Sequence, residues 1–97
     1  MHSPDIDSLF EGILQLNSVE ECYAFFEDLC TINELMSMSQ RFTVAKMLYE
    51  KRTYTDIAEA TGASTATISR VARALNYGDD GYKAVLERTE KNKNGRP

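Results

Sequence analysis

The stretch GASTATISR, residues 62–70, combines short hydroxyl and methyl side chains with one arginine at its end. Thr65, Ala66, Thr67 and Ser69 are small enough for a helix to lie deep in the major groove of DNA, which is about 12 Å wide. Threonine and alanine methyl groups can contact thymine methyl groups, and the hydroxyl groups can reach base edges or phosphates. These residue types therefore predict a surface that reads DNA.

Basic side chains flank this stretch on both sides. Arg70 and Arg73 lie at its end and just beyond, and Lys51 and Arg52 precede it. Contacts to phosphates position a protein on DNA, whereas contacts to base edges give sequence specificity. The predicted DNA-binding residues are Thr53, Tyr54, Ser64, Thr65, Ala66, Thr67, Ser69, Arg70 and Arg73.

Residues 53–76 have the pattern of two helices joined by a tight turn. Thr53 is predicted to cap the first helix, and Ser64 or Thr65 the second. Gly62 comes where the chain must reverse, and a positive φ is inexpensive only for glycine. The inward positions are filled by Ile57, Ala58, Thr61, Ile68, Val71, Ala72 and Leu75. This spacing predicts a DNA-binding helix-turn-helix.

The first half of the chain is also predicted to be helical. Apolar residues recur every three or four positions over 6–14, 19–30 and 32–48, with a break at 37–39 left open. No run alternates as a strand would, so the expected fold class is all-α. A chain this short buries only about 60% of its extended surface. The surplus apolar faces therefore favour a homodimer with interlocked N-terminal helices over a monomeric bundle.

The pattern predicts a single domain over residues 1–88. Within it we expect dimerisation helices over 1–50 and a C-terminal helix over 79–88. Residues 89–97 contain no large apolar side chain, so we expect a flexible polar tail there.

The distribution of charge divides the chain, although the net charge is −4. Residues 1–40 carry eight acidic side chains and no Lys or Arg, whereas residues 41–73 carry six basic and three acidic side chains. The middle third therefore suits a polyanion, and the acidic third suits another partner. No apolar run approaches the roughly 20 residues of a membrane span. The N-terminus resembles no signal peptide, so we expect a cytoplasmic protein that does not bind membranes.

Enzymatic activity is not predicted. The chain has one histidine, His2, and offers no nucleophile–histidine pair, phosphate-binding loop or metal-ligand cluster. No cofactor or metal is therefore expected. The competing hypothesis to a DNA reader is a protein-protein interaction module. Such a module would keep the helix-turn-helix shape and dock another protein through the acidic third, without specific DNA binding.

The segments TYTDIAEATGASTATISRVARALNYGDDGYKAVLER, residues 53–88, and QRFTVAKML, residues 40–48, resemble the Trp repressor superfamily. The resemblance is strongest to its YerC/YecD-type Trp-repressor-like branch and covers roughly residues 35–88. It implies an all-α, intertwined homodimer with two helix-turn-helix units in successive major grooves, about 34 Å apart. By analogy with the family, the function is that of a transcription regulator, with repression as the expected effect.

The same resemblance implies a site for a tryptophan corepressor, between two arginines and a hydroxyl group. Arg70 matches one arginine. Gln40 falls on the other position, with Arg41 adjacent, and Ala74 falls where the hydroxyl is required. Tryptophan is therefore disfavoured as a ligand of Arg41 and Arg70. The alternatives are DNA binding without a corepressor, or another small effector.

Overall fold

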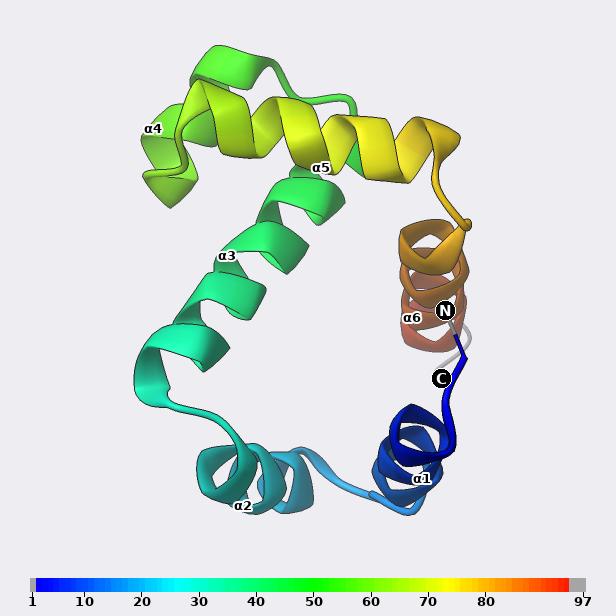
Figure 1. Ribbon diagram of the computed structural model, residues 1–97. Helices are drawn as coiled ribbons and strands as arrows, with labels where there is room; N and C mark the ends of the chain where they lie inside the picture. The colour runs from blue at the N-terminus through cyan, green and yellow to red at the C-terminus, as the bar shows by residue number, and fades with distance from the viewer. Residues whose placement is uncertain (1, 95–97) are drawn as a thin grey trace. The chain divides into compact units, whose positions relative to one another are not determined.

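The computed structural model describes residues 2–94, which form six α-helices and no strand. The helices are α1 (Pro4–Ile13), α2 (Val19–Leu29), α3 (Ile32–Tyr49), α4 (Tyr54–Thr61), α5 (Thr65–Tyr77) and α6 (Gly81–Asn94) (Figure 1). The predicted all-α class is therefore confirmed. Among the described residues, none of these helices has the length and apolar character needed to cross a membrane.

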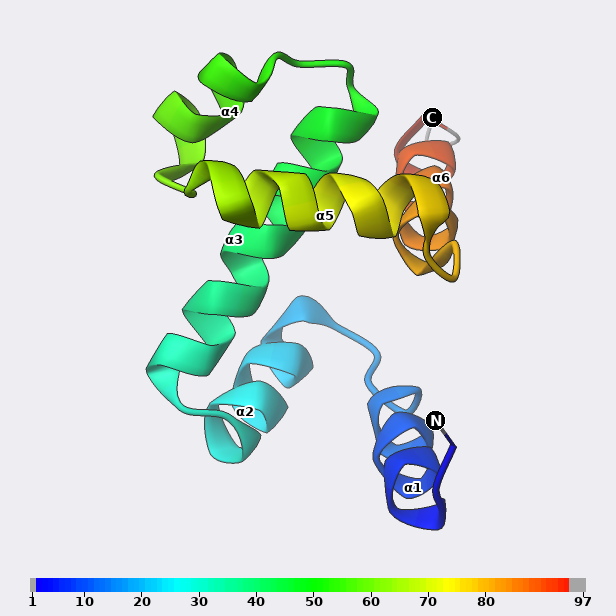
Figure 2. The same cartoon turned by 45° about the horizontal axis from the view of Figure 1, so that its top comes forward.

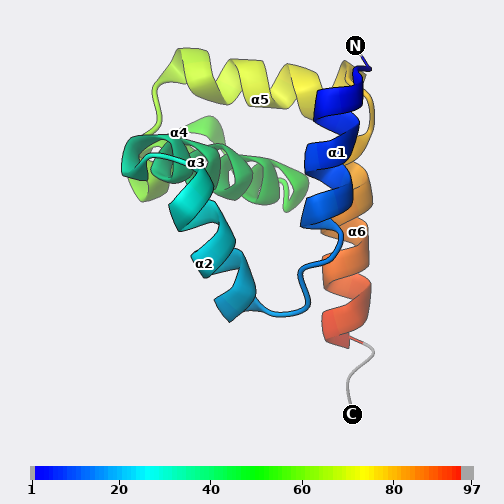
Figure 3. The same ribbon diagram turned by 60° about the horizontal axis from the view of Figure 1, so that its bottom comes forward.

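The chain separates into two compact units, residues 1–35 and 36–97. Helices α1 and α2, which belong to the first unit, contain no buried residue of their own. In Figure 3 these two helices are separate rods joined by the linker 14–18. All 11 Lys and Arg residues of the chain belong to the second unit.

The helices of the first unit begin at sites that the sequence specifies. Ser3 caps α1, which starts at Pro4, and its hydroxyl oxygen accepts from the Ile6 amide. Ser18 caps α2 and accepts from the Glu21 amide at 3.0 Å. Side-chain caps of this kind satisfy amide groups that have no partner within the helix. Local sequence is thus sufficient to fix where these helices start.

Helix α3 runs without interruption through Ser37–Ser39, so the break left open there does not occur. Thr31 and Glu34 form a reciprocal capping box at its start: the Glu34 amide donates to the Thr31 hydroxyl, and the Thr31 amide donates to the Glu34 carboxylate. The Ser37 hydroxyl accepts from the guanidinium of Arg41 one turn later. The serine side chain therefore bonds along the helix surface without disrupting the main chain.

The second unit contains the hydrophobic core. Helix α5 lies across α3 (Figures 1 and 2), and the buried side chains of both helices meet those of α4 and α6 in one cluster. That cluster consists of Val44, Ala45, Met47, Ile57, Ala63, Ile68, Val71, Leu75 and Leu86. The core therefore fixes the helix-turn-helix against the C-terminal half of α3.

Helix α6 begins at Gly81 and continues to Asn94, six residues beyond the predicted end at 88. The predicted tail, 89–97, is therefore helical over 89–94, and residues 95–97 lie outside the described part of the chain. The extension contains strong helix formers, and Glu87 and Lys91 place opposite charges four residues apart. An absence of apolar side chains removes packing from a helix without preventing it from forming.

Candidate nucleic-acid interface

The turn of the predicted helix-turn-helix is formed by caps on either side of one glycine. The Thr53 hydroxyl accepts from the Asp56 amide at the start of α4. Helix α4 ends at Thr61, and the φ of 71° at the following Gly62 lies in the left-handed region that suits glycine. Ser64, not Thr65, then caps α5 by accepting from the Thr67 amide.

The inner faces of the two helices pack as the spacing predicted. Ile57 and Ile68, the main anchors of α4 and α5, are almost completely buried, and Ala58 packs against the core. The small Ala58 allows α5 to approach α4 closely. Ala63, in the turn itself, is also buried, a contribution that the sequence pattern did not reveal. The turn is therefore part of the core and not a loose connector.

The outer face of α5 presents short side chains to solvent. Thr65, Ala66 and Ser69 are exposed, while Thr67 is half-buried. The hydroxyl groups of Thr65 and Ser69 make no hydrogen bond within the described part of the chain. The Ser64 hydroxyl, in contrast, accepts from the Thr67 amide and donates to the Thr67 hydroxyl. Thr65 and Ser69 are thus better placed than Ser64 to bond a ligand.

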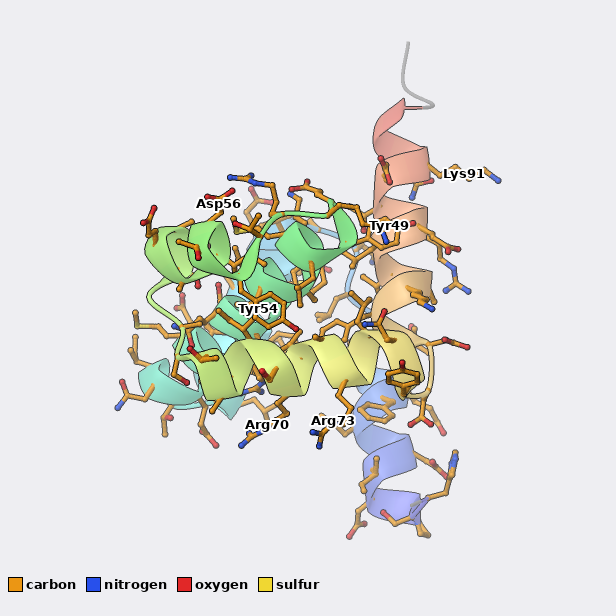
Figure 4. The ribbon with its side chains drawn as sticks, turned by 90° about the horizontal axis from the view of Figure 1, so that it is seen from above. Tyr49, Tyr54, Asp56, Arg70, Arg73 and Lys91 are labelled. Atoms are coloured by element: carbon orange, nitrogen blue, oxygen red, sulfur yellow. The ribbon has the colours of Figure 1, made fainter. Side chains whose placement is uncertain are left out.

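Two arginines extend this face toward the C-terminal half of α5. Arg70 and Arg73 are exposed, and their side chains leave the same side of the helix (Figure 4), as residues three apart should. Helix α5 contains no acidic residue. Its solvent-facing surface is therefore positively charged, and its N-terminal end adds the partial positive charge of the helix dipole.

The start of α4 is arranged differently from α5. Arg52 lies 3.8 Å from the Asp56 carboxylate across the cap, so its charge is partly offset. Tyr54 is exposed, and in Figure 4 it lies on the opposite side of α5 from Arg70 and Arg73. The structure therefore separates the predicted contact at Tyr54 from Arg70 and Arg73, the two arginines of α5.

Tyr54 borders a half-open cleft of about 860 Å³ that lies among α3, α5 and α6. Leu75 and Leu86 contribute apolar lining, and Lys46 and Lys83 contribute positive charge. Sequence spacing could not have revealed this cleft, because its lining residues come from segments far apart in the chain.

Two of the residues aligned with a corepressor site make hydrogen bonds within the chain. The Gln40 amide nitrogen donates to the carbonyl oxygen of Thr61, and Arg41 donates to Ser37 on its own helix. Two surface hollows border α5, one of them lined by Ala74, and neither is lined by Arg41 or Arg70. The bond of Gln40 was not predicted, because its partner lies 21 residues away and no local pattern specifies it.

Comparison with known proteins places this geometry in a family. The family model described as Trp repressor protein matches residues 4–90. YerC of Bacillus subtilis (strain 168), an uncharacterised protein, is 56% identical over 90 residues, which cover 93% of this chain and 86% of YerC.

Two solved structures are also similar. A TrpR-like protein from Eubacterium eligens ATCC 27750 is 64% identical, with a TM-score of 0.88 and 91% of both chains covered. A protein from Staphylococcus aureus, described provisionally as a Trp repressor, is 52% identical with a TM-score of 0.88. The match covers 92% of this chain and 89% of that one. At these identities the similarity extends to sequence as well as fold.

Proposed function

Since the chain belongs to the Trp repressor family, we propose that it is a sequence-specific DNA-binding transcription regulator that acts as a homodimer. Repression is the expected effect by analogy with the family. The Trp repressor family is a family of regulators and not of enzymes, which agrees with a surface devoted to binding.

The observation that carries this proposal is the outer face of α5. Its first turns expose Thr65, Ala66 and Ser69, and its later turns expose Arg70 and Arg73 on a helix without acidic residues. Short side chains allow the helix to approach base edges, and the arginines can bond phosphates. Both the shape and the charge of this face suit the major groove.

The homodimer is supported by the first unit of the chain. Helices α1 and α2 have no buried residue, and the exposed apolar side chains of this unit include Phe10, Leu14, Val19 and Tyr23. A second copy of the chain could cover these faces. It would also supply a second α5, the helix proposed to read DNA and called the reading helix below. Two such helices, about 34 Å apart, would bind a roughly palindromic site.

Tryptophan is not part of the proposal. A corepressor acts by binding the DNA-competent state more tightly than other states. Gln40 and Ala74 stand at two of the three positions where the family resemblance requires corepressor contacts. Calorimetry with L-tryptophan tests this directly: we expect no saturable heat and no increase in DNA affinity. Another small effector is not needed for the proposed activity.

Selection from random DNA tests the function. Duplexes of about 30 base pairs, long enough for two successive major grooves, are offered to the full chain at low salt, and the retained sequences are determined. We expect a common, roughly palindromic site. A pool that stays random after repeated selection would contradict sequence-specific binding.

A matched variant separates binding from folding. In Thr65→Glu/Thr67→Glu, both new carboxylates lie in the first turn of α5. Glutamate is favourable there because of the helix dipole, and Glu at 67 would complete a capping box with Ser64. The variant should be as stable as the parent protein and yet lose the selected DNA, because the new charges repel phosphates. Retained affinity would place the DNA contacts elsewhere.

The second candidate function is a protein-protein interaction module. It is favoured by one observation, the acidic and partly apolar surface of the first unit, which carries no Lys or Arg. In that case the protein should bind no DNA at low salt, and the Thr65→Glu/Thr67→Glu variant should behave as the parent protein does. The selection experiment therefore discriminates between the two functions.

A further inference from the structure

One side-chain hydrogen bond joins two different helices within the described part of the chain. The amide nitrogen Nε2 of Gln40, on α3, donates to the main-chain carbonyl oxygen of Thr61 at 3.1 Å. Every other side-chain hydrogen bond between described residues spans four positions or fewer. The ion pairs there are also local. Gln40 therefore supplies the polar connection between α3 and the helix-turn-helix.

The acceptor of this bond lies where the helix-turn-helix reverses direction. Thr61 is the last residue of α4, and carbonyl groups in the last turn of a helix have no partner within it. The Thr61 hydroxyl donates to the Ile57 carbonyl at 2.7 Å and accepts from the Ala63 amide at 3.1 Å. Gln40 thus acts on a residue that also organises the turn around Gly62.

The bond complements the apolar core. Gln40 lies one helical turn before Val44 and therefore on the same face of α3. Val44 is fully buried in the core that anchors α4 and α5. Apolar contacts are not directional, whereas a hydrogen bond fixes both distance and angle. The core can hold the helices together, and the Gln40 bond can fix the position of the turn that leads into α5.

We propose that Gln40 is a positioning residue for DNA recognition. Its hydrogen bond to Thr61 holds the turn between α4 and α5, and hence the start of the reading helix, in the DNA-binding arrangement without a bound effector. This inference rests on the proposed DNA-binding function and deepens it. The side chain that stands at a corepressor position in the family resemblance here supplies order from within the chain.

The test uses Gln40→Met, which keeps the length of the side chain and removes the donor. The first measurement is affinity for the DNA site selected with the parent protein. The second is hydrogen exchange of the Gly62 and Ala63 amides in the free protein. Loss of one hydrogen bond should weaken DNA binding about three- to tenfold and speed exchange of both amides by a similar factor. Leu86→Ala is the control. It removes buried apolar contacts from α6 and leaves the hydrogen bond between Gln40 and Thr61 in place.

Leu86→Ala should lower the stability at least as much as Gln40→Met, with DNA affinity within about twofold of the parent protein under conditions where it stays folded. Unchanged affinity and exchange in Gln40→Met would overturn the proposal. An equal loss of affinity in both variants would also overturn it, because it would reduce the effect to stability. If the parent protein selects no DNA site, the proposed function fails, and with it the role in recognition. Faster exchange at Gly62 and Ala63 in Gln40→Met would then still establish that Gln40 orders the turn.

Discussion

At the residue scale, the hydroxyl groups of the helix-turn-helix divide into two kinds. Those of Thr53, Thr61 and Ser64 are engaged in caps and in the turn. Those of Thr65 and Ser69 are exposed and have no partner within the described residues. The sequence predicted the caps, because capping depends on neighbours three positions away. It could not distinguish the groups left for a ligand, because that depends on the fold around them.

Arg73→Gln tests the electrostatic part of DNA binding. Each phosphate contact contributes about 0.9 to the slope of log affinity against log salt concentration. In the proposed homodimer each of the two copies loses one such contact, so the steepness of that slope should fall by about two. The measurement is a salt titration of affinity for the selected site. Arg88→Gln removes the same charge from exposed α6 and should leave the slope unchanged; equal slopes for all three proteins would argue against a phosphate contact at Arg73.

Lys51→Gly should stabilise the protein. Lys51 follows α3 with a φ of 66°, a left-handed conformation that costs side chains other than glycine about 1 kcal/mol. Glycine also makes the unfolded chain more flexible, which offsets part of this cost. We therefore expect the free energy of unfolding, measured by heat or denaturant, to rise by about 0.5 kcal/mol.

Asp80→Gly is the matched control for this change. Asp80 has a φ of 63°, but aspartate tolerates the left-handed region better than lysine does. Its replacement should therefore give a smaller gain. A loss of stability in Lys51→Gly would indicate that the Lys51 side chain makes contacts that outweigh its backbone cost.

At the element scale, caps and turns decide where each helix begins and which way the next one leaves. The sequence pattern found most of these boundaries correctly. It placed the end of α6 too early, because the absence of large apolar side chains after residue 88 is common to a polar tail and to a solvated helix.

The stability of the capping box at the start of α3 should depend on pH. The hydrogen bond from the Thr31 amide, together with that of the Thr31 hydroxyl, lowers the pKa of Glu34 below its ordinary value of 4.5. The ionised form therefore stabilises the folded state above pH 4.5, and this contribution is lost as pH falls through the lower folded pKa. NMR titration of the Glu34 carboxyl carbon should give this lowered midpoint. Glu34→Gln should remove the corresponding pH dependence of α3, and an ordinary midpoint for Glu34 would contradict the capping box.

Gly78→Ala should destabilise the turn between α5 and α6. A Cβ atom at Gly78 would clash with the carbonyl oxygen of Ala74, which belongs to the main chain and cannot move aside alone. We expect a loss of about 1–3 kcal/mol in unfolding free energy. Gly12→Ala is the matched control, because a Cβ atom there meets nothing within 4 Å. Alanine in this helical position should raise the free energy of unfolding by about 0.5–1 kcal/mol. Similar effects of the two substitutions would contradict this account of the turn.

At the scale of the whole molecule, the two units have different chemistry. The first is acidic, and its helices α1 and α2 bury no residue, whereas the second holds the core and all Lys and Arg side chains. A unit without a core of its own needs a partner to cover its apolar faces. Under the proposed function, that partner is a second copy of the chain.

Leu14→Asp tests the homodimer. Leu14 is 78% exposed, so in a monomer its replacement should change little. In a dimer that covers this side chain, burial of the new carboxylate would be costly. The dimer should therefore dissociate into monomers at micromolar concentration. Sedimentation equilibrium gives the mass directly. Gln15→Asp adds the same charge at the adjacent exposed position and should leave the dimer intact, whereas a monomeric parent protein would refute the assembly.

The sequence by itself determined the helical class, the turn at Gly62, the caps and the short side chains on the outer face of α5, since all of these depend on residues within about four positions of one another. Only the tertiary structure decided how Gln40 reaches Thr61, that Ala63 joins the core, that Tyr54 lies apart from the two arginines of α5, and that α1 and α2 bury nothing. These features depend on which distant segments meet in space. The local spacing of residues does not predict such long-range contacts, because they follow from the combined burial of many side chains and not from any one pattern.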